Sequence, residues 1–322
     1  PIHTFNMLNG VDYNNAVDFE STYYYGNWDD VGASAHWGAE ATYDYFFDNF
    51  GRNSIDDLGF PLLNYVHTDV GYTSAFWDGS RMTYGDGDGI NYNPLVAIDI
   101  IAHELTHGLT EFTSNLLYYG ESGALNESFS DIFGNVVEFQ VEGLPGSDTV
   151  SWRMGEDMTV SGNGLRNMEN PNEFYNPDTY YGQYWRPVNA SFDNGGVHIN
   201  SGVPNFWFYL LASGGSGTND KGFSYNVTGI GIDNAASIAY HNNTSILTPF
   251  SNFYAARDGS IACAEALFGV GSPEAISTAD AWDAVGVYQL EIPTNDDCTN
   301  AIPLSCGDVV TGNTVYATFD AA

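Results

Sequence analysis

The chain has 322 residues, 43% of them apolar, and contains no apolar run near the about 18–20 residues that a membrane-spanning helix needs. Seven lysine and arginine residues against 41 aspartate and glutamate residues give a formal net charge of −34. The negative electrostatic field of such a chain repels nucleic acid and anionic membranes. We therefore expect a globular protein that binds neither nucleic acid nor membranes.

The first part of the chain is predicted to be rich in β-structure. From residue 1 to about residue 94, aromatic residues alternate with Asn, Asp and Gly, as in "STYYYGNWDD" and "FWDGSRMTYGDGDGINYNP", which is typical of strands and turns. One helix interrupts this pattern at 33–50, "ASAHWGAEATYDYFFDNF". We therefore expect a β-rich N-terminal lobe over residues 1–96.

Helical periodicity dominates from residue 97 onward. Apolar residues spaced by three and four positions predict helices at 98–112, 125–139, 203–212, 233–240, 251–268 and 273–285. The fold class is therefore α+β, with an α-helical C-terminal lobe over residues 97–290. A cleft between the two lobes is a natural place for a site.

The end of the chain differs in character. Residues 291–322 are predicted to be a linker, around "EIPTNDDC", and the truncated start of an appended β-type domain, "VVTGNTVYATF". Cys298 and Cys306 can pair there if the compartment is oxidising, which leaves Cys263 as a buried free thiol. The N-terminus has neither a basic segment nor a cleavage pattern, so we expect that any export signal has been removed.

The helix at 98–112 contains "HELTH", in which two histidines are four positions apart. At about 100° per residue, one of its faces is apolar and carries Ile98, Ile101, Ala102, Leu105, Leu109 and Phe112. His103 and His107 lie on the opposite face, about 40° apart, so both imidazoles can reach one point. Glu104 lies to one side of this pair. From there its carboxylate can contact a metal-bound water molecule more readily than the metal ion itself. The alternative is a surface helix with incidental histidines, which would produce this motif about once in a hundred such chains.

A third ligand follows in the next predicted helix. Zinc in a hydrolase needs three protein ligands and one open position. Glu127 supplies the third ligand, and Asp131, one turn further, can accept a hydrogen bond from a ligating imidazole. Glu127 alone would be an ordinary solvated glutamate. Together with the upstream motif, it predicts one catalytic Zn²⁺ held by His103, His107 and Glu127.

These motifs and four others resemble the thermolysin family of secreted zinc metalloendopeptidases, the bacterial neutral proteases. The segments that carry the resemblance between residues 2 and 287 are "SAFWDGSRMTYGDGDG", "IAHELTHG", "YYGESGALNESFSDIFG", "GLRNMENP", "DNGGVHINSG" and "AWDAVGV". Six separated motifs in the family's order are highly specific. The resemblance implies a thermolysin-like two-lobe fold with the zinc in the cleft between the lobes.

The resemblance also implies the roles of individual residues. Those matched to catalytic roles are Glu104, Tyr118, His198 and Asp193, and those matched to the supports of the two histidines are Asn126 and Asp131. Glu104 would act as general base toward a zinc-activated water and then as proton donor. Tyr118 and His198 would hydrogen-bond the developing oxyanion, while Asp193 orients that histidine. Considered alone, Tyr118 is one of 22 tyrosines and His198 is a loop histidine, for which packing or solvent exposure is the default.

The implied activity is hydrolysis of peptide bonds on the N-terminal side of bulky apolar residues. The residue after the scissile bond would enter a pocket lined by Tyr92, Leu95, Ile100, Met154, Met158 and Leu165. An apolar lining favours Leu, Phe, Ile or Val, since each buried CH₂ contributes about 0.8 kcal/mol; the alternative is that these residues are simply core. Arg166 matches a position for the substrate backbone, and Ala75 and Trp77 border the substrate strand. Ser74 stands where the family usually has the longer Asn.

A structural calcium site is the second metal site that the resemblance implies. The carboxylates that match part of the family's calcium cluster are Asp99, Glu138 and Glu156. Ser151 and Arg153 stand where thermophilic members carry acids, and a guanidinium is incompatible with a tightly paired two-calcium site. We therefore expect one Ca²⁺, bound with help from Asp148. The remaining histidines, expected to be structural or exposed, are His3, His36, His67 and His241.

The form of the protein is inferred from the same resemblance. Family members are secreted and made with an inhibitory prosegment, so we expect an extracellular monomer whose partners are protein or peptide substrates and its own prosegment. The resemblance implies that the chain begins roughly 35 residues inside the family's N-terminal lobe, so we expect that the family's first strands are absent, processed away or not recorded in this sequence.

Two rival interpretations remain. The first is a secreted calcium-dependent binding or adhesion module, which would not need Glu104 beside two histidines. The second is a zinc hydrolase of non-peptide substrates, which would not need Arg166 or the segment 74–77. A chelator-sensitive casein assay separates the first rival from a protease.

Overall fold

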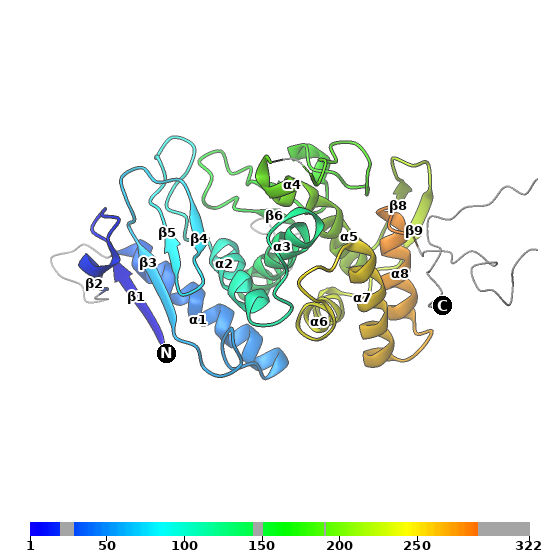
Figure 1. Cartoon of the computed structure of the whole chain (residues 1–322), viewed down its shortest axis with the longest axis horizontal. Helices are drawn as coiled ribbons and strands as arrows, with labels where there is room; N and C mark the ends of the chain where they lie inside the picture. Colours follow the sequence, from blue (N-terminus) through cyan, green and yellow to red (C-terminus); the bar gives the residue numbers. More distant parts are fainter. Residues whose placement is uncertain (20–28, 144–150, 190, 289–322) are drawn as a thin grey trace, which may run out of the picture. The chain divides into compact units, whose positions relative to one another are not determined.

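A computed structural model of the chain describes residues 1–19, 29–143, 151–189 and 191–288 (Figure 1). Pro1–Val287 form one compact unit and Tyr288–Ala322 another. The division into two lobes at residue 96 falls inside the first unit and stays a prediction. The expectations that lie outside the described residues are the strands and turns in "STYYYGNW", the contribution of Asp148 to a calcium site, the pairing of Cys298 with Cys306 and the appended domain at 291–322.

The N-terminal region is built on one mixed sheet. Its strands are β1 (Ile2–Asn6), β2 (Val17–Asp18), β3 (Leu62–Val66), β4 (Ala75–Trp77) and β5 (Met82–Tyr84), and their order in space is β2-β1-β3-β5-β4. β1, β3 and β5 are parallel, whereas β2 and β4 pair antiparallel at the two edges. Among the described strands, β4 pairs with a neighbour on one side only. Apart from the Trp77 N–H, which donates to Glu104, its outer edge can therefore pair with an extended chain.

The helix α1 (Asp30–Phe50) packs on this sheet through contacts with β1 and β3. It covers the predicted helix at 33–50 and begins three residues earlier. The reason is a capping side chain, since the Asp29 carboxylate accepts a hydrogen bond from the Gly32 N–H at 2.9 Å. Gly51 ends the helix in the left-handed conformation, with φ at 69°.

The rest of the first unit is mainly helical, and the predicted helices are present with shifted ends. The helices are α2 (Ile98–Glu111), α3 (Gly120–Glu142), α4 (Asp193–Asn200), α5 (Gly202–Ser213), α6 (Ile232–His241), α7 (Phe253–Phe268) and α8 (Pro273–Ala284). Two antiparallel strand pairs and three short turns complete the described part of the unit. The strands are β6 (Arg153–Met154) with β7 (Arg166–Asn167) and β8 (Gly215–Thr218) with β9 (Ser224–Val227). The turns are the 3₁₀ turns η1 (Tyr13–Asn15) and η2 (Pro171–Phe174) and the π-helical turn η3 (Asn242–Ile246). Cys263 is buried and free, as expected. No helix in the described parts of the chain is long and apolar enough to cross a membrane.

α2 lies between α1 and α3 (Figure 1). All of its residues are buried except His107 and Glu111. His103 and Glu104, on the face opposite the apolar stripe, are each 6% exposed, because α3 covers that face. Gly134 of α3 allows the close approach: a Cβ atom there would lie 2.7 Å from the carbonyl oxygen of Asp99. A surface helix with incidental histidines is therefore not what the chain forms.

Two expectations about these helices are wrong. Phe112 was predicted to face the core, but α2 ends at Glu111, and Phe112 is 43% exposed with its ring 5.2 Å from that of Phe60. His198 was predicted to lie in a loop, but it belongs to the short helix α4. The segment before it contains "DNGG", whose composition indicates a turn rather than a helix.

His67 links the sheet to α1. Its Nδ1 donates to Asp86 Oδ1 at 2.9 Å and its Nε2 donates to Asp29 Oδ1 at 3.0 Å. The hydrogen bond to Asp86, assisted by Asp29 and opposed by partial burial, raises the pKa of His67 to about 9. At neutral pH the imidazole is therefore a cation between two carboxylates, in a chain that has few other cations.

Replacing His67 with Asn should make the stability of the protein less dependent on pH. Because the folded pKa lies above the ordinary value, the stabilisation is fully present below about pH 6.5 and is lost as the pH rises through about 9. Asn tolerates the positive φ of 57° at this position. Allowing for solvent screening, we expect a loss of about 1–2 kcal/mol at about pH 6, measured by urea unfolding.

The matched control is His3→Asn, at an exposed histidine of β1. It should change the unfolding free energy little at either pH. An equal loss for His67→Asn at about pH 6 and about pH 10 would contradict the proposed cationic link.

Candidate metal centre

Two neighbouring helices bring three metal-binding side chains to one point. α2 carries His103 and His107, and α3 carries Glu127. The two Nε2 atoms are 3.0 Å apart, and the Glu127 carboxylate lies 3.6 Å from His103 Nε2 and 3.5 Å from His107 Nε2. The three residues predicted from the sequence thus offer one ligand atom each to the same small volume.

The other nitrogen of each imidazole is held by a residue of α3. His103 Nδ1 lies 2.9 Å from Asp131 Oδ1, and His107 Nδ1 donates to Asn126 Oδ1 at 2.7 Å. These partners keep the proton on Nδ1 and leave the Nε2 lone pairs for a metal ion. The structure therefore places Asn126 and Asp131 where the sequence resemblance expects them.

Asp131 is itself fixed by two further side chains. Arg166 donates to it through Nε at 2.7 Å and through Nη2 at 2.6 Å, and Asn205 of α5 donates through Nδ2 at 2.8 Å. Burial raises the pKa of Asp131, but Arg166 and His103 outweigh this effect and hold it well below its ordinary range. Asn205 was missed by the sequence reasoning, because no motif joins it to a residue 74 positions earlier.

Glu127 is a fully buried carboxylate that stays ionised. Burial raises its pKa, but His107, His198 and His103 outweigh this effect and lower the pKa to about 2. Its Oε2 atom has no hydrogen-bond partner among the described residues. A buried anion with an unpaired oxygen requires a nearby cation. Two imidazole nitrogens and one carboxylate are the ligand set of many catalytic zinc sites, so these residues fit Zn²⁺.

Glu104 lies beside this group without belonging to it. Its Oε2 atom accepts a hydrogen bond from the backbone N–H of Trp77, at 3.0 Å. Trp77 belongs to the edge strand β4, so the hydrogen bond connects the sheet to the metal-bearing helix. The carboxylate is buried and, among the described residues, a single donor orients it, which leaves its other oxygen for a proton-transfer partner.

Two further polar side chains, Tyr118 and His198, contact Glu127. Tyr118 donates its hydroxyl to Glu127 Oε1, and the same hydroxyl lies 3.1 Å from His198 Nε2. His198 Nδ1 donates to Asp193 Oδ1 at 2.5 Å. Burial and the neighbouring Glu127 raise the pKa of Tyr118, so its phenol stays protonated and is a donor at neutral pH.

The backbone before His198 has an unusual conformation that positions it. Asp193, Asn194, Gly195 and Gly196 all have positive φ, and a Cβ atom on Gly195 would lie 2.5 Å from the carbonyl oxygen of Val188. This turn directs Asp193 back onto His198, whose backbone N–H also donates to Asp193 Oδ2 at 3.0 Å. Asp and Asn are among the few other residues that tolerate this conformation.

The six residues predicted to line a substrate pocket form one apolar cluster. Leu95, Ile100, Met154 and Met158 are buried, and Tyr92 and Leu165 pack against them and are partly exposed. The cluster is separate from the main hydrophobic core. Ala75 of β4 also packs against it, so the cluster borders the free edge of the sheet.

The predicted calcium ligands also meet. Ligand oxygens of Asp99, Glu138 and Glu156 lie within 4.8 Å of one another. Burial, and the neighbouring Asp99 and Glu156, raise the pKa of Glu138 to about 10, and burial, opposed by the Gly155 N–H, raises that of Asp99 to about 7. One oxygen each of Glu138 and Glu156 has no partner within the described ranges. Three carboxylates without a cation among them fit a divalent ion with oxygen ligands.

The expectation of a single calcium ion stays a prediction. The guanidinium of Arg153 donates to both carboxylate oxygens of Glu173 at 2.8 and 2.9 Å, and its charge partly opposes the rise that burial causes in the pKa of Glu156. A second group of carboxylates, missed in the sequence, joins Glu138 with Glu142 and Asp157. Among the described residues, the two groups together contain five carboxylates, Glu138 included, rather than the three that the motifs indicate.

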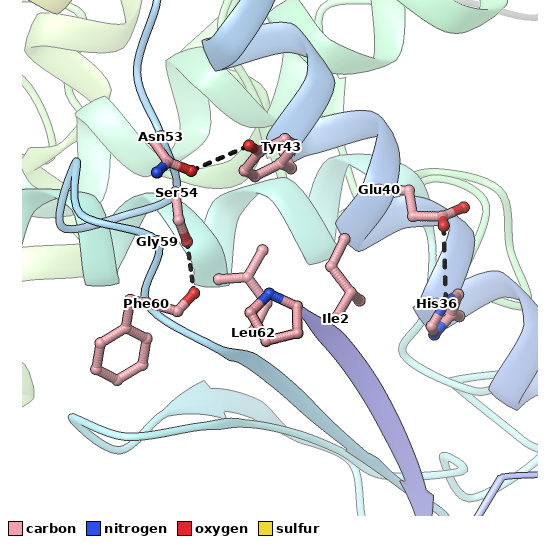
Figure 2. Close-up of a pocket in the computed structure, with 10 residues that line it drawn as sticks. Ile2, His36, Glu40, Tyr43, Asn53, Ser54, Gly59, Phe60 and Leu62 are labelled. Atoms are coloured by element: carbon pink, nitrogen blue, oxygen red, sulfur yellow. Dashed lines mark hydrogen bonds and ion pairs between the residues drawn. The ribbon is translucent and has the colours of Figure 1, made fainter.

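Two cavities differ in their relation to this centre. One, of about 370 Å³, has His107, Tyr118 and Asn126 in its wall and so adjoins the metal-binding residues. A larger one, of about 530 Å³, lies beside α1 at the beginning of β1 and β3 (Figure 2). Its polar residues bond to one another or to the backbone, for example Tyr43 to Asn53 at 3.1 Å, and none of its lining residues belongs to the metal centre. The first cavity is the better candidate for a functional site.

Two family models match consecutive parts of the chain. The thermolysin metallopeptidase catalytic domain matches residues 2–111, and the thermolysin metallopeptidase alpha-helical domain matches residues 114–287. The break between the two lies just after α2 and thus inside the first compact unit. All the residues of the candidate metal centre fall within these matches.

Individual proteins show the same similarity. Bacillolysin from Bacillus cereus is 44% identical over 264 residues, which are 81% of this chain and 44% of that protein. Thermolysin from Alicyclobacillus acidocaldarius subsp. acidocaldarius is 40% identical over 269 residues, 82% of this chain and 47% of that protein. The chain thus spans less than half of the length of these relatives. Among solved structures, the precursor of protealysin, a metalloproteinase from Serratia proteamaculans, superposes with a TM-score of 0.72 at 32% identity and covers 89% of this chain and 87% of its own.

Replacing Asn126 with Ala should weaken zinc binding by about 10–100-fold, because His107 loses the partner that orients its ring. Competition with a chromophoric zinc chelator measures this affinity. Asn49→Ala is the matched control. The Asn49 amide donates to the backbone carbonyl of Tyr45 at 2.9 Å, but Asn49 lies in α1, which carries none of the proposed metal ligands. Equal zinc affinity in the wild type and Asn126→Ala would show that Asn126 does not support a metal ligand.

Proposed function

Because the chain belongs to the thermolysin family of metallopeptidases, we propose that it is a zinc-dependent endopeptidase that cleaves peptide bonds on the N-terminal side of bulky apolar residues. The observation that carries the proposal is the convergence of His103, His107 and Glu127 with Glu104 adjacent to them on α2. The chain covers less than half of its curated relatives, so this activity is a proposal for the protein of which the chain is part.

His103, His107 and Glu127 would hold one Zn²⁺, which supplies Lewis acidity that makes water a nucleophile at neutral pH. Asn126 and Asp131 keep the two imidazoles in the tautomer that can bind a metal. The ionised state of Glu127 contributes the negative charge that completes the ligand set.

Glu104 is the proposed general base and acid. One oxygen is anchored by the Trp77 N–H, at 3.0 Å, so the carboxylate is held in place before substrate binds. It would accept a proton from the attacking water and deliver that proton to the leaving nitrogen of the cleaved peptide bond. Asp and Glu residues perform this task because a carboxylate can both accept and return the proton.

Tyr118 and His198 are proposed to stabilise the negative charge that develops on the substrate carbonyl oxygen. Their hydroxyl and Nε2 are 3.1 Å apart, so both can point at one oxygen atom. Tyr118 is a donor because its phenol stays protonated. Asp193, 2.5 Å from His198 Nδ1, holds the ring with Nε2 toward the site.

The substrate is proposed to bind as an extended strand along the free edge of β4. This mode uses main-chain hydrogen bonds for affinity and places alternate side chains in pockets. Ala75 and Trp77 lie in that strand, and Ser74 precedes it. Two nitrogens of Arg166 donate to Asp131, and we assign the third, Nη1, to a carbonyl of the substrate.

The residue after the scissile bond is assigned to the apolar cluster around Leu95, Ile100, Met154 and Met158. The support for this assignment is that the cluster borders β4 and stands apart from the main core. Partly exposed Tyr92 and Leu165 would open it to a substrate side chain. Burial of that side chain would favour Leu, Phe, Ile and Val.

The proposal extends to a structural calcium site and to the form of the protein. Asp99, Glu138 and Glu156 are the proposed calcium ligands, since their ligand oxygens lie within 4.8 Å of one another and one oxygen each of Glu138 and Glu156 has no partner among the described residues. We also propose that the protein is secreted, acts as a monomer on protein or peptide substrates, and is made with an inhibitory prosegment. The precursor form of protealysin among the similar structures supports the last point.

Replacing Glu104 with Gln should leave about one zinc ion per chain and reduce peptide cleavage by at least about 10²-fold, because the amide can accept the Trp77 hydrogen bond but cannot take a proton. Zinc is measured by elemental analysis and cleavage by mass spectrometry of a peptide library. The control Glu40→Gln, at an exposed residue of α1, should cleave like the wild type. Retained cleavage by Glu104→Gln would disprove the mechanism, and wild-type cleavage before charged residues would disprove the pocket assignment.

Calcium should raise the melting temperature of the zinc-loaded protein. At about 100 times the dissociation constant, binding stabilises by about 2.7 kcal/mol, which corresponds to a shift of about 5–10 °C for a unit of this size. Glu138→Gln should lose most of this shift, because Glu138 belongs to both carboxylate groups. Glu274→Gln in α8 is the control. A melting temperature that does not depend on calcium at constant free zinc would exclude the site.

A further inference from the structure

The cavity of about 370 Å³ lies at the C-terminal end of α2, next to the metal centre. His107 and Tyr118 form the wall that it shares with that centre. Glu111, the last residue of α2, and Trp77 of β4 form the wall toward the sheet. Phe250 forms the opposite rim. A side chain bound here would thus be attached to a peptide backbone that crosses the metal-binding residues.

Backbone hydrogen bonds fix the segment around Pro249 and Phe250, which forms the wall of the cavity opposite Glu111. The backbone N–H of Leu117 donates to the carbonyl of Pro249 at 2.9 Å. The turn that follows is closed by the Ser251 N–H, which donates to the carbonyl of Thr248 at 3.0 Å. Phe250 is 81% exposed at the rim, so its ring offers apolar surface to the stem of a long side chain.

Glu111 is the only acidic residue that lines this cavity among the described residues. The indole Nε1 of Trp77 donates to its Oε2 atom at 2.7 Å, which fixes the carboxylate and leaves Oε1 for another donor. Glu111 also lies in the last turn of α2, which contains no basic residue. A negative charge at this end of a helix is unfavourable, since it adds to the negative end of the helix dipole. The chain therefore concentrates negative potential at one wall of the cavity.

We propose that Glu111 makes this cavity a subsite for an arginine or lysine side chain of the peptide substrate, on the amino-terminal side of the scissile bond. The inference rests on the proposed endopeptidase function. A guanidinium or ammonium group donates to Glu111 Oε1, and its aliphatic stem packs against Phe250 and Leu117, both exposed. The residue thus determines specificity and takes no part in the proton transfers.

The direction follows from where the two candidate subsites lie along α2. The apolar cluster, assigned to the residue after the scissile bond, includes Ile100 in the first turn of the helix. Glu111 lies at the other end, and the metal-binding His103 and His107 lie between them. A strand that crosses the metal centre with its carboxyl-terminal side at Ile100 places earlier residues near Glu111. The overall charge of −34 attracts a cationic peptide wherever its cationic residue stands. This cavity, in contrast, favours a cationic residue at one position of the peptide only.

The test compares quenched fluorescent peptides that carry arginine or citrulline at each of the three positions before a scissile bond to leucine. Citrulline keeps the shape of arginine but not its charge. For the wild-type zinc enzyme, we expect the kcat/KM ratio of arginine to citrulline to reach about fivefold at one of these positions. The ratio should fall toward one in Glu111→Gln and remain at the wild-type value in Glu40→Gln.

A charge reversal provides a second variant with the opposite expectation. Glu111→Lys should prefer glutamate to glutamine at the same position of the peptide, because the charge on this wall of the cavity changes from negative to positive. Since Glu111 lies at an unfavourable end of α2, both variants should melt at or above the wild-type temperature, which shows that they are folded.

The possible outcomes separate this inference from the proposed function. If the wild type cleaves the citrulline peptides but shows no preference for arginine, or if Glu111→Gln keeps the preference, the subsite is wrong and the endopeptidase activity stands. A preference for arginine after the scissile bond also overturns the subsite. If the wild type cleaves none of the peptides, the proposed function itself fails.

Discussion

The buried negative charge of Glu127 is the constraint on which the rest of the centre depends. A carboxylate without solvent is stable only when cations or donors surround it. Three imidazoles, those of His103, His107 and His198, surround it, and in their protonated form they lower the pKa of Glu127 to about 2. When His103 and His107 are neutral, a metal ion at their Nε2 atoms would supply that positive charge instead. All three imidazoles are within 3.6 Å of the Glu127 oxygens, so α2, α3 and α4 must keep their positions relative to one another. Gly134 serves this requirement, because it allows α2 and α3 to pack closely.

The structure compensates its buried anions in two ways. Asp131 is neutralised by protein groups, with Arg166 bound to both of its oxygens and His103 on one of them. No arginine or lysine among the described residues donates a hydrogen bond to Glu138, and burial, followed by repulsion from Asp99 and Glu156, raises its pKa. A chain with seven lysine and arginine residues cannot supply a cation for every buried carboxylate. Histidine, as in the link made by His67, and metal ions are the remaining means of compensation.

The sequence predicts well those features that depend on residues close together in the chain. The spacing of His103 and His107 and the apolar periodicity of α2 require only the geometry of one helix. The position of His198 in α4 was missed, because four successive residues with positive φ have no apolar period to detect. The pairing of Arg153 with Glu173 was also missed. The sequence shows both residues, but only the fold determines which of the many carboxylates binds a given guanidinium. The same holds for Asn205 and Glu111, because only the fold places Asn205 beside Asp131 and Glu111 beside Trp77.

The central claim is that His103, His107 and Glu127 form a single zinc site rather than an acidic surface that binds metal nonspecifically. X-ray absorption at the zinc edge of the protein loaded with one equivalent of zinc tests it most directly. The account predicts a low-coordinate shell that includes two imidazole nitrogens, with ligands at about 2.0–2.1 Å. A shell of oxygen atoms alone, without the scattering pattern of imidazole, would place the zinc among the carboxylates and contradict the account.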